Sequence, residues 1–161
     1  MTHKTTILGA GRRIAASVIM TLAMAAPAMG GNFSLGVEAG AGFKHNDDGG
    51  GLFVRALYLG ENGGGCGLIA GSWYGDYEND VAGVTCEKRF RTADSEFHRL
   101  SVGIGLVDLT PSQIVNSDWA LELHLRYFAT PHIALAMTHF SNAGSADPNR
   151  GYNFLGIEVI F

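Results

Sequence analysis

Apolar and polar positions alternate along most of the chain beyond residue 30. From Phe33 to Phe43 every second residue is apolar, and the residues between them are small or charged. The same alternation returns in four later segments: 99–106, 121–127, 133–137 and 155–161. A period of two is typical of β-strands that have one apolar and one polar face, so the pattern predicts an all-β fold.

The number and length of the strands point to a membrane barrel. Three further segments fit the alternation less regularly: 52–60, 66–74 and 81–90. A turn at Ala129-Thr130-Pro131 separates the strand over 121–127 from one that runs from His132 to Ser141. Several strands exceed the five or six residues usual in soluble proteins. We therefore expect an eight-stranded antiparallel transmembrane β-barrel of the outer-membrane type over residues 31–161.

Alternation alone does not distinguish a lipid-facing barrel from a soluble periplasmic β-sandwich, because both have one apolar face. Glu122, His124 and Arg126 share one face of their strand, which suits a polar barrel interior. Aromatic residues fall near predicted strand ends, as in interfacial girdles: Trp73, Tyr74, Trp119, Tyr127, Phe128 and Phe161. The terminal Phe161 also resembles the assembly signal of bacterial outer-membrane barrels. These features favour the barrel over the sandwich.

The first thirty residues have the composition of a signal peptide. Positive charges at Lys4 and Arg12 precede an uncharged apolar run over 14–26, and a small-x-small sequence ends at Gly30. A membrane-anchoring helix is the alternative, but it needs ~20 apolar residues, and this run is shorter. We expect residues 1–30 to be a cleaved signal peptide and the mature chain to lie in the bacterial outer membrane.

The composition limits the kinds of partner and ligand that we expect. The net charge of −4 leaves no basic stripe for phosphates, so nucleic acid is not an expected partner. The 23 glycines suggest a barrel wall where side chains must stay small. Cys66 and Cys86 are the only cysteines. They provide no metal framework, and either a single disulfide or two small half-buried side chains fits them.

The candidate chemistry lies on the last two predicted strands. His139 and Ser141 share the lipid-facing side of one strand at its extracellular end, and Asn153 has the same orientation on the next. Polar groups that face lipid need an explanation, and a serine hydroxyl becomes a nucleophile when a neighbouring base takes its proton. For an isolated His-x-Ser sequence, two interfacial polar residues are the simpler interpretation.

A longer motif favours the catalytic interpretation. The run T-H-F-S-N-A-G-S-A-D-P-N-R-G from Thr138 to Gly151 resembles the C-terminal motif of the PagL-type outer-membrane lipid A 3-O-deacylases. The resemblance implies an eight-stranded barrel with a Ser-His-Glu triad on its outer surface, which removes an ester-linked acyl chain from lipid A without metal or cofactor. It assigns the general base to His139, the nucleophile to Ser141 and oxyanion stabilisation to Asn149. The loop that shapes the site is matched by Asn142 and Gly144.

One position departs from the family pattern. Asn153 stands where the family has the glutamate that orients the histidine, so the triad reads Ser-His-Asn. Asparagine accepts the imidazole N–H bond but supplies no charge, and the equivalent change in a serine protease lowers turnover by ~10⁴. Asp147 lies in the same loop as an alternative acid, whereas Glu158 has interior parity. A slow enzyme, an enzyme with a relocated acid, and a non-catalytic structural or lipid-binding barrel all stay open.

The remaining expectations concern partners. The resemblance implies lipid A, or lipopolysaccharide, as substrate within outer-membrane lipid, and a homodimer stays open beside a monomer.

His124 and His132 have interior parity, where a hydrogen-bonded network is a better interpretation than a metal site because no ligand spacing is present. The glycine-rich run over 60–65 lacks the lysine ending of a phosphate loop and predicts a turn.

Overall fold

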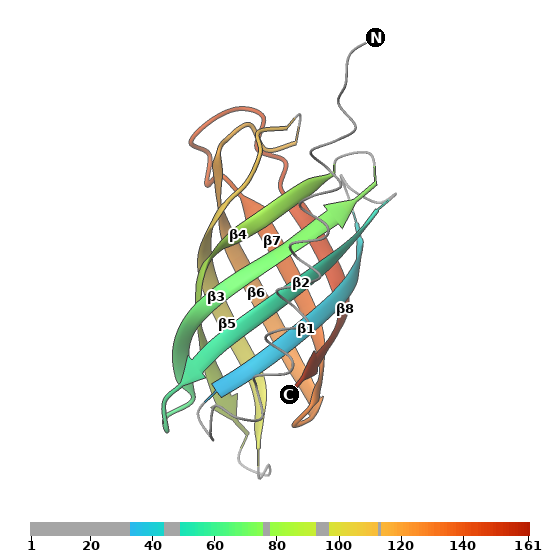
Figure 1. Cartoon of the computed structure of the whole chain (residues 1–161). Helices are drawn as coiled ribbons and strands as arrows, with labels where there is room; N and C mark the ends of the chain where they lie inside the picture. Colours follow the sequence, from blue (N-terminus) through green and yellow to red (C-terminus); the bar gives the residue numbers. More distant parts are fainter. Residues whose placement is uncertain (1–32, 44–48, 76–77, 93–96, 113) are drawn as a thin grey trace.

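Eight strands pair in chain order, and the last pairs with the first, which closes an antiparallel barrel with tilted strands (Figure 1). In this computed structural model the strands are β1 (Phe33–Gly42), β2 (Gly50–Leu59), β3 (Gly64–Tyr74), β4 (Asn79–Arg91), β5 (His98–Asp108), β6 (Trp119–Thr130), β7 (Ile133–Ser141) and β8 (Tyr152–Ile160). The described residues are 33–43, 49–75, 78–92, 97–112 and 114–161. The predicted signal peptide lies outside them.

The strands match the predicted ones to within two or three residues at most ends. β7 begins at Ile133, so His132 lies in the turn before it and is exposed, with Nδ1 3.0 Å from the carbonyl oxygen of Ile160. The predicted interior position of His132 is therefore wrong. The tight turn, and not the strand alternation, decides where this side chain points.

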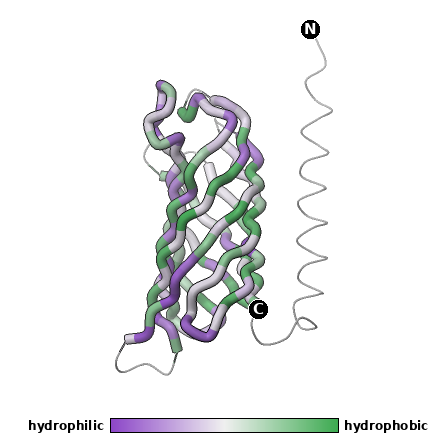
Figure 2. The backbone as a smooth tube through the Cα atoms, turned by 90° about the vertical axis from the view of Figure 1, so that its left-hand side faces the viewer, coloured by the Kyte–Doolittle hydropathy of each residue, from purple (hydrophilic) through white to green (hydrophobic). Residues whose placement is uncertain are grey.

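The two faces of the wall have opposite character, as the alternation predicts. On β6 the side chains of Leu123 and Leu125 are 47% and 40% exposed, whereas Glu122 and Arg126 are buried inside. Figure 2 shows hydrophobic and hydrophilic positions alternating along the strands. A soluble sandwich would bury the leucines against a second sheet. The polar inside and apolar outside are those of an outer-membrane barrel.

Charged side chains fill the middle of the barrel and form what we call the interior polar network. Arg55 binds Glu122 at 2.7 Å and Glu38 at 2.6 Å, and Arg126 binds Glu158 at 2.9 Å and also contacts Glu87. The remaining members are His124, which contacts Glu87 and Glu122, and Thr138. Each buried charge has an opposite partner, which offsets the cost of its removal from water.

Glycines of the wall make room for this network. A Cβ on Gly103 would collide with the His124 ring, and one on Gly36 would collide with the Glu158 carboxylate. The sequence-based expectation that side chains must stay small along the wall is met at these positions. The room is used by the polar side chains of His124 and Glu158, which belong to the neighbouring strands β6 and β8.

An aromatic plug fills the end of the interior nearest the β7–β8 connection. Its rings pack with centroids 4.4 to 6.3 Å apart and belong to Phe53, Trp73, Phe140, Tyr152 and Phe154. Trp73 is only 3% exposed, and Phe128 at the other end of the interior is 2% exposed. Both were expected in the interfacial girdle, and both point inward, because sequence position near a strand end does not fix the face.

Cys66 and Cys86 are directly paired across β3 and β4 and form a disulfide. The structure thus decides between the two interpretations of these cysteines. Within the described residues, no helix is long and apolar enough to cross a membrane.

The connections differ between the two ends of the barrel. The β6–β7 turn contains only Pro131 and His132, and β2 and β3 are joined by residues 60–63. At the opposite end, β5–β6 and β7–β8 are joined by the longer loops 109–118 and 142–151. Outer-membrane barrels have short periplasmic turns and longer extracellular loops, so the loop 142–151 lies at the end that corresponds to the extracellular end of such barrels.

Candidate active site

His139 and Asn153 face each other across the last two strands. They are direct register partners on β7 and β8, and Nδ1 of His139 lies 2.9 Å from Oδ1 of Asn153. Because an amide oxygen only accepts hydrogen bonds, the ring hydrogen is on Nδ1. In a neutral ring of this tautomer the lone pair is on Nε2, which is the arrangement that a general base requires.

Ser141 ends β7 on the same outer face as His139. Both side chains are partly exposed and alternate with the buried Thr138, Phe140 and Asn142. Two residues of extended strand separate their Cα atoms by roughly 6.6 Å, a span that side chains on one face can bridge. The strand period thus brings His139, Ser141 and Asn153 to one lipid-facing patch, as the sequence predicts.

The loop over 142–151, which we call the site loop, is organised by two asparagines. The backbone N–H of Asn142 donates to Oδ1 of Asn149 at 2.9 Å, and Oδ1 of Asn142 accepts from the Gly144 N–H at 3.0 Å. Nδ2 of Asn142 donates to the Ala146 carbonyl at 2.7 Å. The amides of Asn142 and Gly144 are thus occupied within the loop. With Oδ1 of Asn149 committed, its Nδ2 is the donor that can serve a substrate.

A second loop holds Asn149 in place. The loop over 109–118, here the support loop, forms an antiparallel bridge between Val115 and Asn149. The Asn116 N–H donates to the Pro148 carbonyl at 3.0 Å, and the Arg150 N–H donates to the Ile114 carbonyl at 2.9 Å. The side chain of Asn116 adds a bond from Nδ2 to the Asp147 carbonyl at 3.0 Å. Ile114 and Val115 are buried against the aromatic plug, which fixes the support loop to the barrel.

Gly151 leaves the space that the His139 ring occupies. Its φ is +73°, a backbone conformation that favours glycine. A Cβ at this position would lie 2.5 Å from Cε1 of His139. The last glycine of the family-like motif is therefore needed both for the turn and for the ring.

A groove on the outer wall leads away from the candidate base. It has a volume of about 530 Å³, and we call it the His139 groove. Its lining is Phe43, Val102, Gly103, Leu123, His124, Leu125, Met137, His139 and Asn153. Most of these are apolar and face lipid, so the groove suits an aliphatic chain whose polar end lies at His139.

The two alternative acids lie elsewhere. Asp147 is exposed in the site loop, and Glu158 is buried in the interior polar network, bound to Arg126. Nδ1 of His139 is bound to Asn153. Among the described residues, no group of three or more histidine, cysteine, aspartate or glutamate side chains could hold a metal ion.

Three contributors to the site were not predicted from the sequence. Gly151 was treated only as the end of a motif, although glycine at the start of a strand is a signal for close approach. Asn116 and Ile114 lie in a loop without periodicity or motif, and nothing in the sequence connects them to Asn149.

Comparison with known protein families gives one match. The sequence model of the family described as "Lipid A 3-O-deacylase (PagL)" matches residues 58–161, which is more than half of the chain. The chain belongs to this family. The match includes β7, β8 and the site loop, so every candidate site residue lies within the PagL region. No curated protein sequence matches the chain.

Solved structures show the same fold. The crystal structure of the outer membrane enzyme PagL superposes with a TM-score of 0.50 at 16% identity, covering 80% of this chain and 98% of that one. The outer membrane protein Ail of Yersinia pestis gives 0.50 at 14% identity, with 82% and 100% covered. The de novo designed TMB2.3 gives 0.50 at 14% identity, with 81% and 96% covered. At these identities the likeness concerns the fold alone.

Proposed function

We propose that this PagL-family barrel is a lipid A 3-O-deacylase, a carboxylic ester hydrolase that removes an ester-linked hydroxyacyl chain in the outer leaflet. The observation that carries the proposal is the bond between His139 Nδ1 and Asn153 Oδ1, on the lipid-facing side and two residues from Ser141. This bond leaves Nε2 as a base. Family membership supplies the substrate class.

The reaction is a double displacement. Nε2 of His139 takes the proton of Ser141 while Oγ attacks the ester carbonyl, and the imidazolium then protonates the leaving sugar oxygen. Water attacks the acyl-serine by the same route, and the free fatty acid leaves. Asn153 acts as a positioning residue that fixes the ring and its tautomer.

Stabilisation of the oxyanion falls to Asn149. Its Oδ1 is bound to the Asn142 N–H, so Nδ2 is available to donate to the developing negative charge. Removal of one oxyanion donor costs about 10²- to 10³-fold in kcat in a serine protease. The occupied amides of Asn142 and Gly144 give those residues the role of shaping the loop.

The position of the site on the barrel supports lipid A as the substrate. The site loop lies at the end of the barrel with the longer loops, and the His139 groove runs over the apolar wall below it. A lipid in the outer leaflet would place its acyl chain in the groove and its ester near Ser141. The steps of the reaction use only side chains of the barrel and water.

A second candidate function is a non-catalytic barrel that is structural or binds lipid. One observation favours it: the group that orients His139 is the neutral amide of Asn153. An uncharged partner stabilises the imidazolium poorly, so the motif could persist with little turnover.

A serine-directed fluorophosphonate probe distinguishes the two functions. We expect the folded barrel to be labelled at Ser141, with loss of labelling in Ser141→Ala and strong reduction in His139→Ala. Ser145→Ala, in the exposed part of the same loop, is the matched control and should retain the label. A folded barrel that takes up no probe at Ser141 would support the non-catalytic function.

A further inference from the structure

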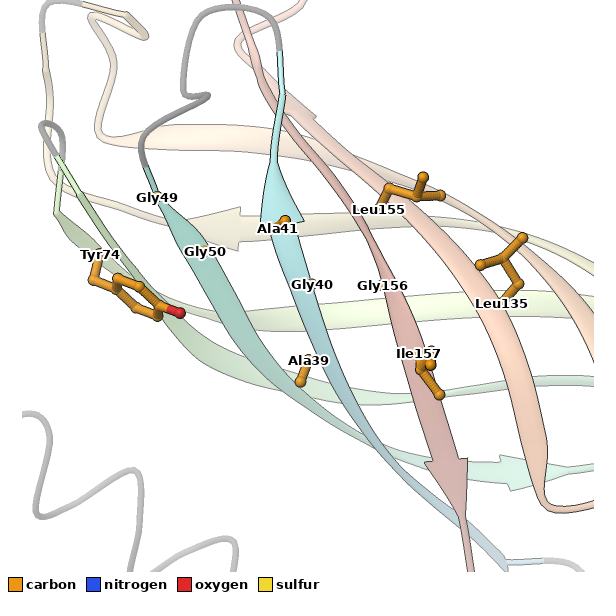
Figure 3. Close-up of a pocket in the computed structure, with 10 residues that line it drawn as sticks. All are labelled: Ala39, Gly40, Ala41, Gly49, Gly50, Tyr74, Leu135, Leu155, Gly156 and Ile157. Atoms are coloured by element: carbon orange, nitrogen blue, oxygen red, sulfur yellow. The ribbon is translucent and has the colours of Figure 1, made fainter.

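A second groove lies on the outer wall, on the other side of the candidate site. It has a volume of about 920 Å³ and crosses β1, β2 and β8. Figure 3 shows Leu135, Leu155 and Ile157 on one side and Tyr74 on the other, with only the small side chains of Ala39 and Ala41 between them. We call it the alanine groove. Its volume lies in the range of sites that hold small apolar ligands.

Strand pairing connects the alanine groove to the candidate site. Leu155 pairs with Ala41 on one side and with Met137 on the other. Met137 lines the His139 groove and Leu155 lines the alanine groove, so these two side chains form the ridge between the grooves. Asn153 lies two residues before Leu155 on the same face of β8. The His139 groove is therefore lined by the His139 and Asn153 pair, and the alanine groove is reached from that pair across Leu155.

The spacing of the grooves fits two chains of one lipid. Neighbouring strands are about 4.8 Å apart, so β7 and β1, which lie on either side of β8, are separated by roughly 10 Å. Acyl chains attached to one head group lie side by side in a leaflet. A lipid with a single chain fills one groove only, whereas a lipid with several chains can straddle the ridge.

We propose that the alanine groove binds a second acyl chain of the same lipid while the chain to be released occupies the His139 groove. This inference rests on the proposed function and adds a substrate preference to it. The enzyme would favour lipids with two or more neighbouring chains over single-chain esters, because the second chain fixes the position of the ester at Ser141.

Filling the groove tests this proposal without disturbing the barrel interior. Ala41 is exposed on the outer face, so Ala41→Phe adds an apolar ring to the groove. Ala82→Phe, on the outer face of β4, is the matched control. For Ala41→Phe we expect kcat/KM on multiply acylated lipid A to fall about tenfold, with kcat/KM on a p-nitrophenyl fatty ester unchanged. The control should change neither. An equal loss on both esters, or no loss on lipid A, would overturn the proposal.

A binding measurement separates failure of this inference from failure of the proposed function. Barrels carrying Ser141→Ala are mixed with multiply acylated lipid A in detergent, and the lipid retained is measured by native mass spectrometry. We expect Ala41→Phe to reduce retention and Ala82→Phe to leave it unchanged, whether or not the parent hydrolyses the lipid. Unchanged retention together with a smaller oligomer in Ala41→Phe would instead identify the groove as an interface between two copies, and the inference would be wrong.

Discussion

Replacing Asn153 by aspartate should accelerate the enzyme. The two side chains are isosteric, so the Asn153→Asp variant would put a carboxylate oxygen where Oδ1 now lies, 2.9 Å from Nδ1 of His139. The negative charge would stabilise the imidazolium that forms as Ser141 loses its proton. The geometry of the site would stay the same, which makes the change in rate a measure of charge alone.

The size of the effect follows from the surroundings of the pair. Opposite charges about 4 Å apart attract by ~4 kcal/mol at an effective dielectric constant of 20 and by ~1 kcal/mol in water. His139 and Asn153 are partly exposed, which places the pair between these limits. Each 1.4 kcal/mol or so of transition-state stabilisation raises a rate about tenfold, so kcat should rise by roughly 5- to 1,000-fold. The upper end lies below the ~10⁴ lost when a protease triad exchanges Asp for Asn.

The assay is release of hydroxy fatty acid from lipid A by purified barrels in detergent, with initial rates measured by mass spectrometry. Asn153→Leu removes the acceptor at similar size and should lower kcat below the parent. A folded Asn153→Asp barrel with unchanged kcat, beside an equally unchanged Asn153→Leu barrel, would refute the reasoning, because Asn153 would then have no influence on His139.

The site and the wall lead to three further predictions. Gly151→Ala should displace the His139 ring and lower kcat at least tenfold while the barrel stays folded, which circular dichroism can check. Asn116→Ala should lower kcat several-fold in the parent but not in the Asn149→Ala background, because Asn116 acts through the segment that holds Asn149. If the double variant lost as much kcat as the two single variants together, this reasoning would be wrong. Replacing Cys66 and Cys86 by serine should lower the free energy of unfolding by about 3 kcal/mol in urea titrations of liposome-inserted barrel, with kcat unchanged.

The alternation of the sequence was sufficient to predict the wall of the barrel. On β6 the charged residues Glu122 and Arg126 alternate with leucines, and the structure places them inside and outside as expected. Positions next to turns were harder to predict. His132 follows the local geometry of a turn and departs from the strand period. Trp73 keeps the inward parity of Ile69 on β3, and its expected place in the outer girdle was wrong because strand parity, and not nearness to the strand end, decides its face.

The site was predictable where strand period decides it and not where loops meet. His139, Ser141 and Asn153 share a face because residues two apart on a strand do, and neighbouring strands align them. The support loop is different. Asn116 contacts Asp147 across 31 positions of sequence, through backbone and amide groups that follow no pattern. Such contacts depend on the way the two loops pack over the plug.

The central claim is that Ser141 releases an acyl chain from lipid A. The most direct test is mass spectrometry of lipid A from outer membranes that contain this protein, compared with membranes that contain the Ser141→Ala variant at equal amounts of folded barrel. The account predicts that lipid A loses one hydroxyacyl chain with the parent and keeps it with the variant. Identical lipid A profiles from the two membranes would contradict it.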